Sequence, residues 1–286
     1  MSSSSPPGQS STGAVASGGN ASRAVLAGQA RPTYRARFIS RWQLAVRSLY
    51  WLGWIAFSRR AVVTSGVERE VDTLGLGALR LVSSAALLVG LIAIFQVAAQ
   101  LAPYGAEIMS VRALTWFAAR ELGPLVVALL LVARSAAQIA GELASMNASG
   151  EIDALRAMGL DPVKYLIAPK LLAILLTLPA LTIFADVLIL FGGWIGSTVF
   201  LGYAPSTFIS AFRESFTSRD LAVGLGKSIV FALVIAVIAS DEGLSTVRRA
   251  REIAGAATRA VVYCLLGVLT ADTVFNAVFY FIPDLL

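Results

Sequence analysis

Long apolar runs alternate with short polar segments along most of the chain. The apolar runs cover residues 79–101, 122–144, 165–203, 221–240 and 260–283. A helix that crosses a bilayer needs about 20 predominantly apolar residues, and each run is long enough to supply them. The pattern therefore predicts an all-α polytopic membrane protein.

The run 165–203 decides how many times the chain crosses. At about 1.5 Å per residue it is too long for one simple span, so the total is five spans if it crosses once and six if it crosses twice. The loop 241–259 is rich in Arg, and basic loops stay on the cytoplasmic side. We therefore predict five spans, with the N-terminus inside and the C-terminus outside. We expect tilt, a kink near Pro179 and an extended stretch around residues 192–196 to take up the surplus length.

The N-terminal part has a different composition. Residues 1–36 are dominated by Ser, Gly, Ala and Pro, which predicts a disordered tail. Residues 37–66 hold a short apolar core with several aromatic residues, bracketed by Arg, which predicts an amphipathic helix lying on the cytoplasmic leaflet. A soluble amphipathic helix is the alternative. Residues 67–286 then form the transmembrane domain.

Composition excludes several classes of function. The chain is 57% hydrophobic and only 14% charged, whereas soluble proteins carry about 25% charged residues. The net charge of +6 reflects basic cytoplasmic loops rather than a nucleic-acid partner. There is no His and one Cys, so a Ser-His-Asp triad, a His-based zinc site and an internal disulfide are excluded. We expect no metal site.

A charged island, ASGEIDALRAMGLDP, separates the second and third apolar runs at residues 148–162. Asn147 or Ser149 is predicted to cap a short helix whose first turn carries acidic residues, as the helix dipole favours. Gly159 is predicted to end that helix in the left-handed conformation. Asp161 and Pro162 then begin the next helix.

The short helix of this island has two different faces. Ile152, Leu155 and Met158 recur at three-residue spacing and form an apolar stripe, while Asp153 and Arg156 lie opposite. This pattern suits a docking helix for a cytoplasmic partner. It equally suits a loop helix that packs against its own protein.

Ionisable residues inside spans are costly, so each needs a cavity or a partner. Arg120 and Glu121 are predicted at the outer start of the second span, and Arg134 well inside it. One interpretation is a polar patch for lipid phosphate, with Arg as a bidentate donor. The other is an ion pair that only orders the helices. Lys227 and Asp272 are expected to form such a structural pair.

One short motif suggests nucleotide binding. The sequence GLGKS at residues 224–228 is similar to the end of a phosphate-binding loop. The complete motif requires Gly where Leu221 stands, and a strand before it. We therefore exclude ATP binding by this chain, and any energy must come from another chain.

The segment from Arg120 to Ala173 resembles the MlaE/YrbE family of permeases, which are membrane subunits of lipid ABC transporters that work with MCE proteins. The resemblance runs from about residue 40 to the end of the chain and is strongest at 118–200. One departure is the Arg-rich sequence STVRRAREIAGAATRAVV, which contains Arg248, Arg249 and Arg251. The matching pieces are Arg120 to Pro124, Gly141-Glu142 to Met146, Glu151 to Leu155, Met158-Gly159, Asp161-Pro162, Pro169 and Ala257 to Val262.

The resemblance implies a role for the charged island and a set of partners. The EIDAL segment would be the coupling helix seated on a cytoplasmic ABC ATPase, and an MCE-domain protein would lie on the outer side. Two copies of the chain would form a homodimer that moves lipid, with no cofactor in this chain because the partner subunit uses the ATP. The implied coupling residues are Glu151, Ile152, Asp153, Leu155, Arg156, Met158 and Asp161; the lipid-binding candidates are Arg120, Glu121 and Arg134.

Location and alternative functions stay open at this point. The bacterial inner membrane is expected, and a plastid inner envelope is the alternative because no acidic residue precedes Glu68. The second functional hypothesis is a secondary transporter that uses Arg134, Lys227 or Asp272 as coupling charges. A third, a membrane-embedded lipid enzyme, lacks His and a clustered carboxylate pair, so we expect no enzymatic activity in this chain.

Overall fold

The structure is a computed structural model that describes residues 61–246 and 250–281. The predicted tail at 1–36 and most of the predicted interfacial helix at 37–66 lie outside the described residues. The same holds for Arg248 and Arg249 of the basic loop.

The described residues form helices and connecting turns, with no strand among them. Five helical segments are long and apolar enough to cross a membrane, so the predicted all-α polytopic fold and five spans are confirmed. These segments are Gly66–Tyr104, Ile108–Ser149, Val163–Phe200, Ser218–Leu244 and Glu252–Phe279.

Each span is built from one or more helical pieces. The first three contain short π- or 3₁₀-helical turns (η), and the last two are single α-helices. Span one begins within α3 (Ala61–Glu70) and continues through η1 (Val71–Gly75), η2 (Leu76–Ala78), α4 (Leu79–Leu101) and η3 (Ala102–Tyr104). Span two comprises α5 (Glu107–Phe117), η4 (Ala118–Leu122), α6 (Gly123–Leu131), η5 (Val132–Ala136) and α7 (Ala137–Ser149). The rest are α8 (Glu151–Ala157), η6 (Val163–Ile167), α9 (Ala168–Ile195), η7 (Gly196–Phe200), α10 (Pro205–Ser215), α11 (Ser218–Leu244) and α12 (Ala250–Phe281).

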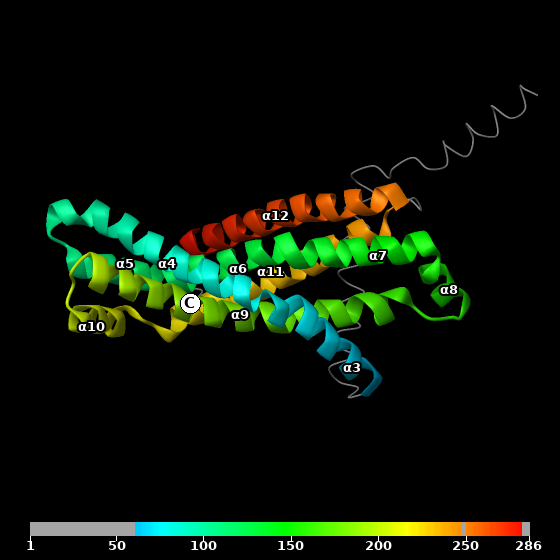
Figure 1. Cartoon of the computed structure of the whole chain (residues 1–286), viewed down its shortest axis with the longest axis horizontal. Coiled ribbons are helices and arrows are strands. Elements are labelled where there is room, and N and C mark those ends of the chain that lie inside the picture. Colours follow the sequence, from blue (N-terminus) through cyan, green and yellow to red (C-terminus); the bar gives the residue numbers. More distant parts are fainter. Residues whose placement is uncertain (1–60, 247–249, 282–286) are drawn as a thin grey trace, which may run out of the picture. The chain divides into compact units, whose positions relative to one another are not determined.

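The long helices lie side by side, with α8 at one end of the bundle and α10 at the other (Figure 1). We call these the α8 end and the α10 end. The α3 helix diverges from the other helices and meets the bundle through α9. The two ends correspond to the two membrane faces, because α8 links spans two and three and α10 links spans three and four.

Span three crosses once, as predicted, but one of the three features expected to take up its surplus length is absent. The α9 helix is continuous from Ala168 to Ile195, with Pro179 inside it. The predicted extended stretch around residues 192–196 is wrong, because these residues are helical. The glycines in this stretch allow neighbouring helices to pack closely and do not produce an extended backbone.

Span two also differs from its predicted limits. Its helix begins at Glu107, so Arg120 and Glu121 lie within the span rather than at its outer start. Hydropathy misplaced this boundary because the two charges interrupt the apolar pattern, whereas the backbone continues through them as a π-helical turn. Such turns are frequent at functional sites.

A close contact between backbones joins α4 to α9. A Cβ atom at Gly90 would overlap the carbonyl oxygen of Ile189, and one at Gly192 would overlap the carbonyl oxygen of Leu87. Small residues allow backbones to approach closely in membrane proteins, where dispersion forces and packing drive association. These glycines therefore fix the spacing of spans one and three.

We expect Gly90→Ala to disrupt this contact and lower thermal stability, at a cost of roughly 1–3 kcal/mol or more from overpacking. The obstructing atom belongs to a backbone and cannot rotate away. Gly141→Ala is the matched control, because a Cβ there would meet no atom within 4 Å. Equal melting temperatures of the two variants in detergent would contradict the proposed contact.

The predicted orientation is tested with single cysteines, because the native Cys264 is buried. Tyr104 at the α10 end is 81% exposed and Met158 at the α8 end is 65% exposed. In intact spheroplasts, an impermeant maleimide should label Tyr104→Cys and leave Met158→Cys unlabelled until the membrane is opened. The opposite labelling would reverse the orientation.

Candidate functional site

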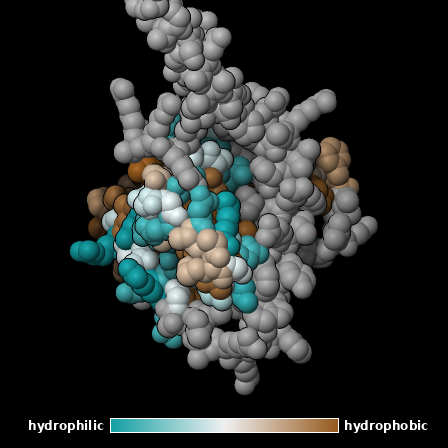
Figure 2. Space-filling model, turned by 90° about the vertical axis from the view of Figure 1, so that its right-hand side faces the viewer, coloured by the Kyte–Doolittle hydropathy of each residue, from teal (hydrophilic) through white to brown (hydrophobic). Residues whose placement is uncertain are grey.

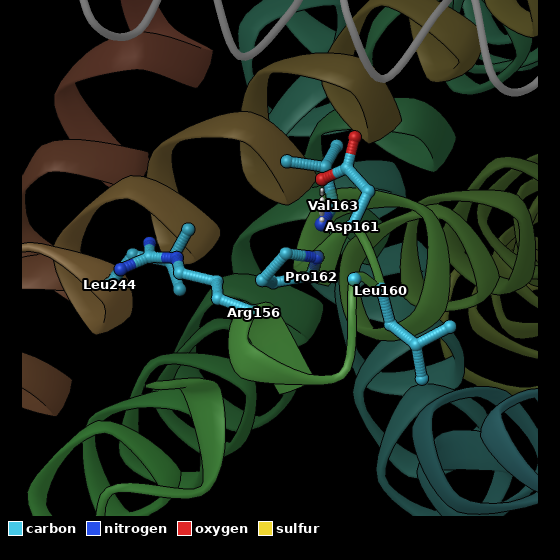
Figure 3. Close-up of a pocket in the computed structure, with 7 residues that line it drawn as sticks. Arg156, Leu160, Asp161, Pro162, Val163 and Leu244 are labelled. Carbon is cyan, nitrogen blue, oxygen red and sulfur yellow. Dashed lines mark hydrogen bonds between the residues drawn. The ribbon is translucent and has the colours of Figure 1, made fainter. Parts of the chain in front are cut away.

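The charged island folds as the short helix α8 between two left-handed glycines. Gly150 has φ +82° and separates α7 from α8, and Gly159 has φ +74° and ends the turn after it, as predicted. Such backbone angles favour glycine because it has no Cβ. Asp161 is confirmed as a cap, since its Oδ1 accepts from the Val163 backbone N–H at 3.0 Å (Figure 3).

The predicted N-cap of α8 is wrong. Gly150 occupies that position, and no side chain caps the helix. Ser149 Oγ instead donates to Glu151 at 2.8 Å. Asn147 Nδ2 donates to the backbone carbonyls of Leu244 at 3.2 Å and Thr246 at 2.8 Å. Asn147 therefore ties α7 to the C-terminal end of α11.

The apolar stripe of α8 is divided between the protein interior and the surface. Ile152 is buried, Leu155 is half-buried and Met158 is 65% exposed. Glu151 and Arg156 are exposed, and Asp153 and Asp161 are half-buried. Ile152 anchors α8 to its own bundle, and the exposed members are available to a partner. Figure 2 shows that the α8 end presents hydrophilic side chains with apolar ones among them.

A cavity of about 380 Å³ lies beside α8 (Figure 3). The turn after α8 forms one side of it and the C-terminal end of α11 forms the other, with the Arg156 side chain pointing toward Leu244. Its lining residues are Arg156, Gly159, Leu160, Asp161, Pro162, Val163 and Leu244.

Two ion clusters near the α8 end join its helices, and each contains one buried charge, Lys170 or Glu242. Lys170 Nζ lies 2.6 Å from Glu70 and 2.7 Å from Glu142, which links α9 to α3 and α7. Arg259 of α12 lies 3.3 Å from Glu242, a fully buried residue of α11. Charges that meet in this way fix the relative positions of helices, since an unpaired buried charge is strongly destabilising.

A third ion cluster is in the half of the bundle nearer the α10 end. Lys227 lies about 14 Å along α11 from its first residue. Its Nζ donates to Glu121 at 2.5 Å, Asp272 at 2.9 Å and Asn276 at 2.6 Å. An ammonium has three N–H groups, and all three have acceptors here. The predicted structural pair of Lys227 and Asp272 is confirmed, within a larger group.

Arg120 extends this group. Its Nε donates to Asp220 at 2.5 Å, and its guanidinium lies 5.1 Å from the centre of the Trp116 ring. We call the whole group the Lys227 cluster. Its members are Arg120, Glu121, Asp220, Lys227, Asp272 and Asn276.

Of the three predicted lipid-binding residues, Arg120 and Glu121 belong to the Lys227 cluster and Arg134 does not. Arg134 is about 20 Å further along span two. Its guanidinium donates to the Thr73 carbonyl at 3.4 Å and packs against Gly77, where an added Cβ would overlap it. The neighbouring Ser135 donates to the Leu74 carbonyl at 3.2 Å. Arg134 and Ser135 fasten the turn that joins α3 to α4.

Sequence reasoning missed Asp220 and Asn276 of the cluster, and also Asp186. Asp186 of α9 is 5% exposed, and neither of its carboxyl oxygens has a hydrogen-bond partner in the described part of the chain. It lies directly against Gly123, where any added Cβ would overlap it. The signal for Asp186 and Asp220 was a charge inside or beside an apolar run.

The sequence GLGKS lies entirely within α11, and its Lys belongs to the Lys227 cluster. A phosphate-binding loop between strand and helix is therefore absent from this segment. The described residues also contain no group of His, Cys, Asp and Glu that could hold a metal ion.

A family model described as Permease MlaE matches residues 67–278, which include all of span two, α8 and the Lys227 cluster. The chain belongs to the MlaE permease family. The family resemblance expected from the sequence is thus confirmed.

Several known proteins are similar to this chain in sequence. The chain is 28% identical over 213 residues to the intermembrane phospholipid transport system permease protein MlaE of Haemophilus influenzae, covering 74% of this chain and 82% of that protein. It is 29% identical over 161 residues to a probable ABC transporter permease protein of Rickettsia prowazekii, covering 56% and 62%. It is 30% identical over 161 residues to the chloroplastic protein TRIGALACTOSYLDIACYLGLYCEROL 1 of Arabidopsis thaliana, covering 56% and 46%.

The position of Arg134 gives a prediction for this MlaE-family chain. Arg134→Ala should lower thermal stability, because the Thr73 carbonyl and the space beside Gly77 lose their partner, at a cost of about 1–3 kcal/mol. Bound lipid per folded protein should be unchanged. Arg134→Lys should restore stability only in part, since Lys lacks the planar fork.

Ser135→Ala is the companion variant, because it removes the neighbouring bond to the same turn. Melting temperature and bound phospholipid are measured on both variants. Normal stability with lost lipid in Arg134→Ala would place Arg134 in contact with substrate.

Proposed function

We propose that this chain is the membrane subunit of an ABC transporter that moves phospholipid between membranes, driven by a separate cytoplasmic ATPase. The observation that carries this proposal is the MlaE-family match, which extends over residues 67–278 and so includes nearly all of the five spans. The Haemophilus relative is named as a phospholipid transport permease, and the Rickettsia relative as a probable ABC transporter permease.

The α8 surface is the proposed ATPase contact. Met158, Glu151 and Arg156 are exposed there, while Ile152 holds the helix to the bundle. The adjoining 380 Å³ cavity offers a place for a side chain of the ATPase. Because Asn147 ties α7 to the end of α11, a displacement of α8 would reach spans two, three and four together.

The Lys227 cluster is the proposed lipid headgroup site. Arg120 has five N–H donors, and among the described contacts only Nε is engaged by an acceptor. The terminal groups of its guanidinium can therefore donate to a lipid phosphate, with Glu121 beside them. Arg134 lies on the same span but donates to the turn between α3 and α4. A lipid bound at Arg134 would therefore lie at a different depth in the membrane from one bound at the Lys227 cluster.

The remaining partners follow from the family resemblance. The proposal includes a homodimer in the bacterial inner membrane, with an MCE-domain protein at the α10 end and the ATPase at the α8 end. The chain itself would hydrolyse no ATP and would need no cofactor. A plastid envelope is the alternative location, and one relative is a chloroplast protein.

A secondary transporter finds less support in this geometry. A coupling charge must exchange partners with an ion or proton during the cycle, whereas each N–H of Lys227 already has an acceptor. Co-purification of an ATPase separates the two functions.

Met158→Asp should abolish association with the ATPase while the permease still inserts and folds. The change places a charge on an exposed side chain of α8 and disturbs no buried contact. Met109→Asp is the matched control, since Met109 is 54% exposed on α5 near the α10 end. Affinity purification with measured ATP hydrolysis gives the readout, and an intact complex with unchanged turnover in Met158→Asp would refute the α8 contact.

A further inference from the structure

The Lys227 cluster contains more acid than base. Its two cations, Arg120 and Lys227, face three carboxylates, those of Glu121, Asp220 and Asp272, so the formal charge of the ionised group is −1. Arg219, next in the chain to Asp220, is exposed, and no ion pair joins it to the cluster in the described structure. A net negative charge within a membrane span is energetically costly unless a positively charged ligand neutralises it.

The excess acid lies on the accessible side of the cluster. The side chain of Lys227 is 1% exposed and that of Asp220 is 7% exposed. The accessible charged members are Arg120 at 29%, Glu121 at 20% and Asp272 at 14%, and the neutral Asn276 is exposed. A headgroup approaching this side therefore meets one guanidinium and two carboxylates.

Unused hydrogen-bonding groups on this side are of two kinds. Glu121 and Asp272 each accept from Lys227 through one oxygen, and their second oxygens have no donor among the described residues. Asn276 accepts from Lys227 through its carbonyl oxygen, which leaves its amide N–H groups as donors beside those of Arg120. Donors suit a phosphate, and carboxylate oxygens suit an ammonium.

We propose that the Lys227 cluster selects phospholipids whose headgroup carries an ammonium as well as a phosphate, and disfavours headgroups that are anionic only. The phosphate would accept from Arg120 and Asn276. The ammonium would donate to the free oxygens of Glu121 and Asp272 and would neutralise the excess charge. An anionic headgroup would leave the two carboxylates facing additional negative charge, which is the repulsion that gives specificity at charged interfaces.

This inference rests on the proposed lipid-transport function, so its test must separate the two. The full-length permease is purified in its ATPase complex and reconstituted in nanodiscs that contain equal amounts of phosphatidylethanolamine, phosphatidylcholine and phosphatidylglycerol. Retained lipid is quantified by mass spectrometry after transfer to detergent. We expect phosphatidylethanolamine to exceed phosphatidylglycerol by roughly tenfold. Phosphatidylcholine should fall between them, because its quaternary ammonium has the charge but no N–H.

Single substitutions test the origin of the preference. Glu121→Gln or Asp272→Asn removes the excess charge and leaves Lys227 with one carboxylate. Each variant should lose most of the headgroup preference, measured as the ratio of phosphatidylethanolamine to phosphatidylglycerol in the lipid that it retains. Glu214→Gln is the matched control: it makes the same change in an exposed pair with Arg112, outside the cluster, and should keep the preference. Arg120→Ala should reduce all bound phospholipid.

The possible outcomes distinguish two failures. Lipid bound without headgroup preference, or with preference for phosphatidylglycerol, would overturn this inference and leave the lipid-transport proposal standing. An unchanged preference in both Glu121→Gln and Asp272→Asn would also overturn it. Absence of retained lipid in the wild-type complex, with no effect of Arg120→Ala, would refute the headgroup site itself.

Discussion

Lys227 places an ammonium inside a membrane span, and the surrounding helices are arranged to satisfy it. Its three acceptors come from η4 of span two and from α12 of span five, while Lys227 itself belongs to span four. Breaking a buried ion pair by removing one partner costs about 3–5 kcal/mol in soluble proteins. The register of spans two, four and five is therefore fixed by this one group, and Arg120 with Asp220 strengthens the same contact between spans two and four.

The two ends of the bundle carry different chemistry. At the α8 end, a short amphipathic helix lies next to a cavity, and the Lys170 and Glu242 ion pairs hold its supporting helices together. Toward the α10 end, the Lys227 cluster is partly accessible and has unused donors and acceptors. Span two runs from one region to the other, and its π-helical turns η4 and η5 coincide with Arg120, Glu121 and Arg134. The two irregular turns of this span thus each carry charged side chains, while Arg112 and Glu142 of the same span lie in regular α-helix.

Much of this architecture could be predicted from sequence because hydropathy reports membrane crossing directly. The five spans, the left-handed Gly159 and the Asp161 cap follow from local composition and spacing. The start of span two did not, since Arg120 and Glu121 resemble a boundary when only hydropathy is considered. The roles of Gly192 and Gly196 were predicted wrongly for a similar reason. The residue type alone does not distinguish a glycine that allows close helix packing from a glycine that interrupts a helix.

The sequence shows which residues in the spans are charged, but it does not show which residues they pair with. Lys227, Asp272, Arg120 and Glu121 stand out as charges in or beside apolar runs, but their partners are far away in the chain. Only the three-dimensional arrangement shows that Asn276 completes the Lys227 contacts, or that Arg134 serves a backbone turn. Ile152 illustrates the same limit, because periodicity suited docking and internal packing equally, and only the tertiary structure shows that Ile152 is buried in its own protein.

The order in which the ribosome delivers these charges has a consequence for biogenesis. Glu121 enters the membrane 106 residues before Lys227, and Asp272 follows 45 residues after it. Until the second half of the chain is inserted, Arg120 and Glu121 of span two therefore lie in the membrane or beside the insertion machinery without their ion-pair partners. Folding of this bundle therefore cannot be completed span by span during synthesis, because the contacts of Lys227 form only after span five has followed spans two and four.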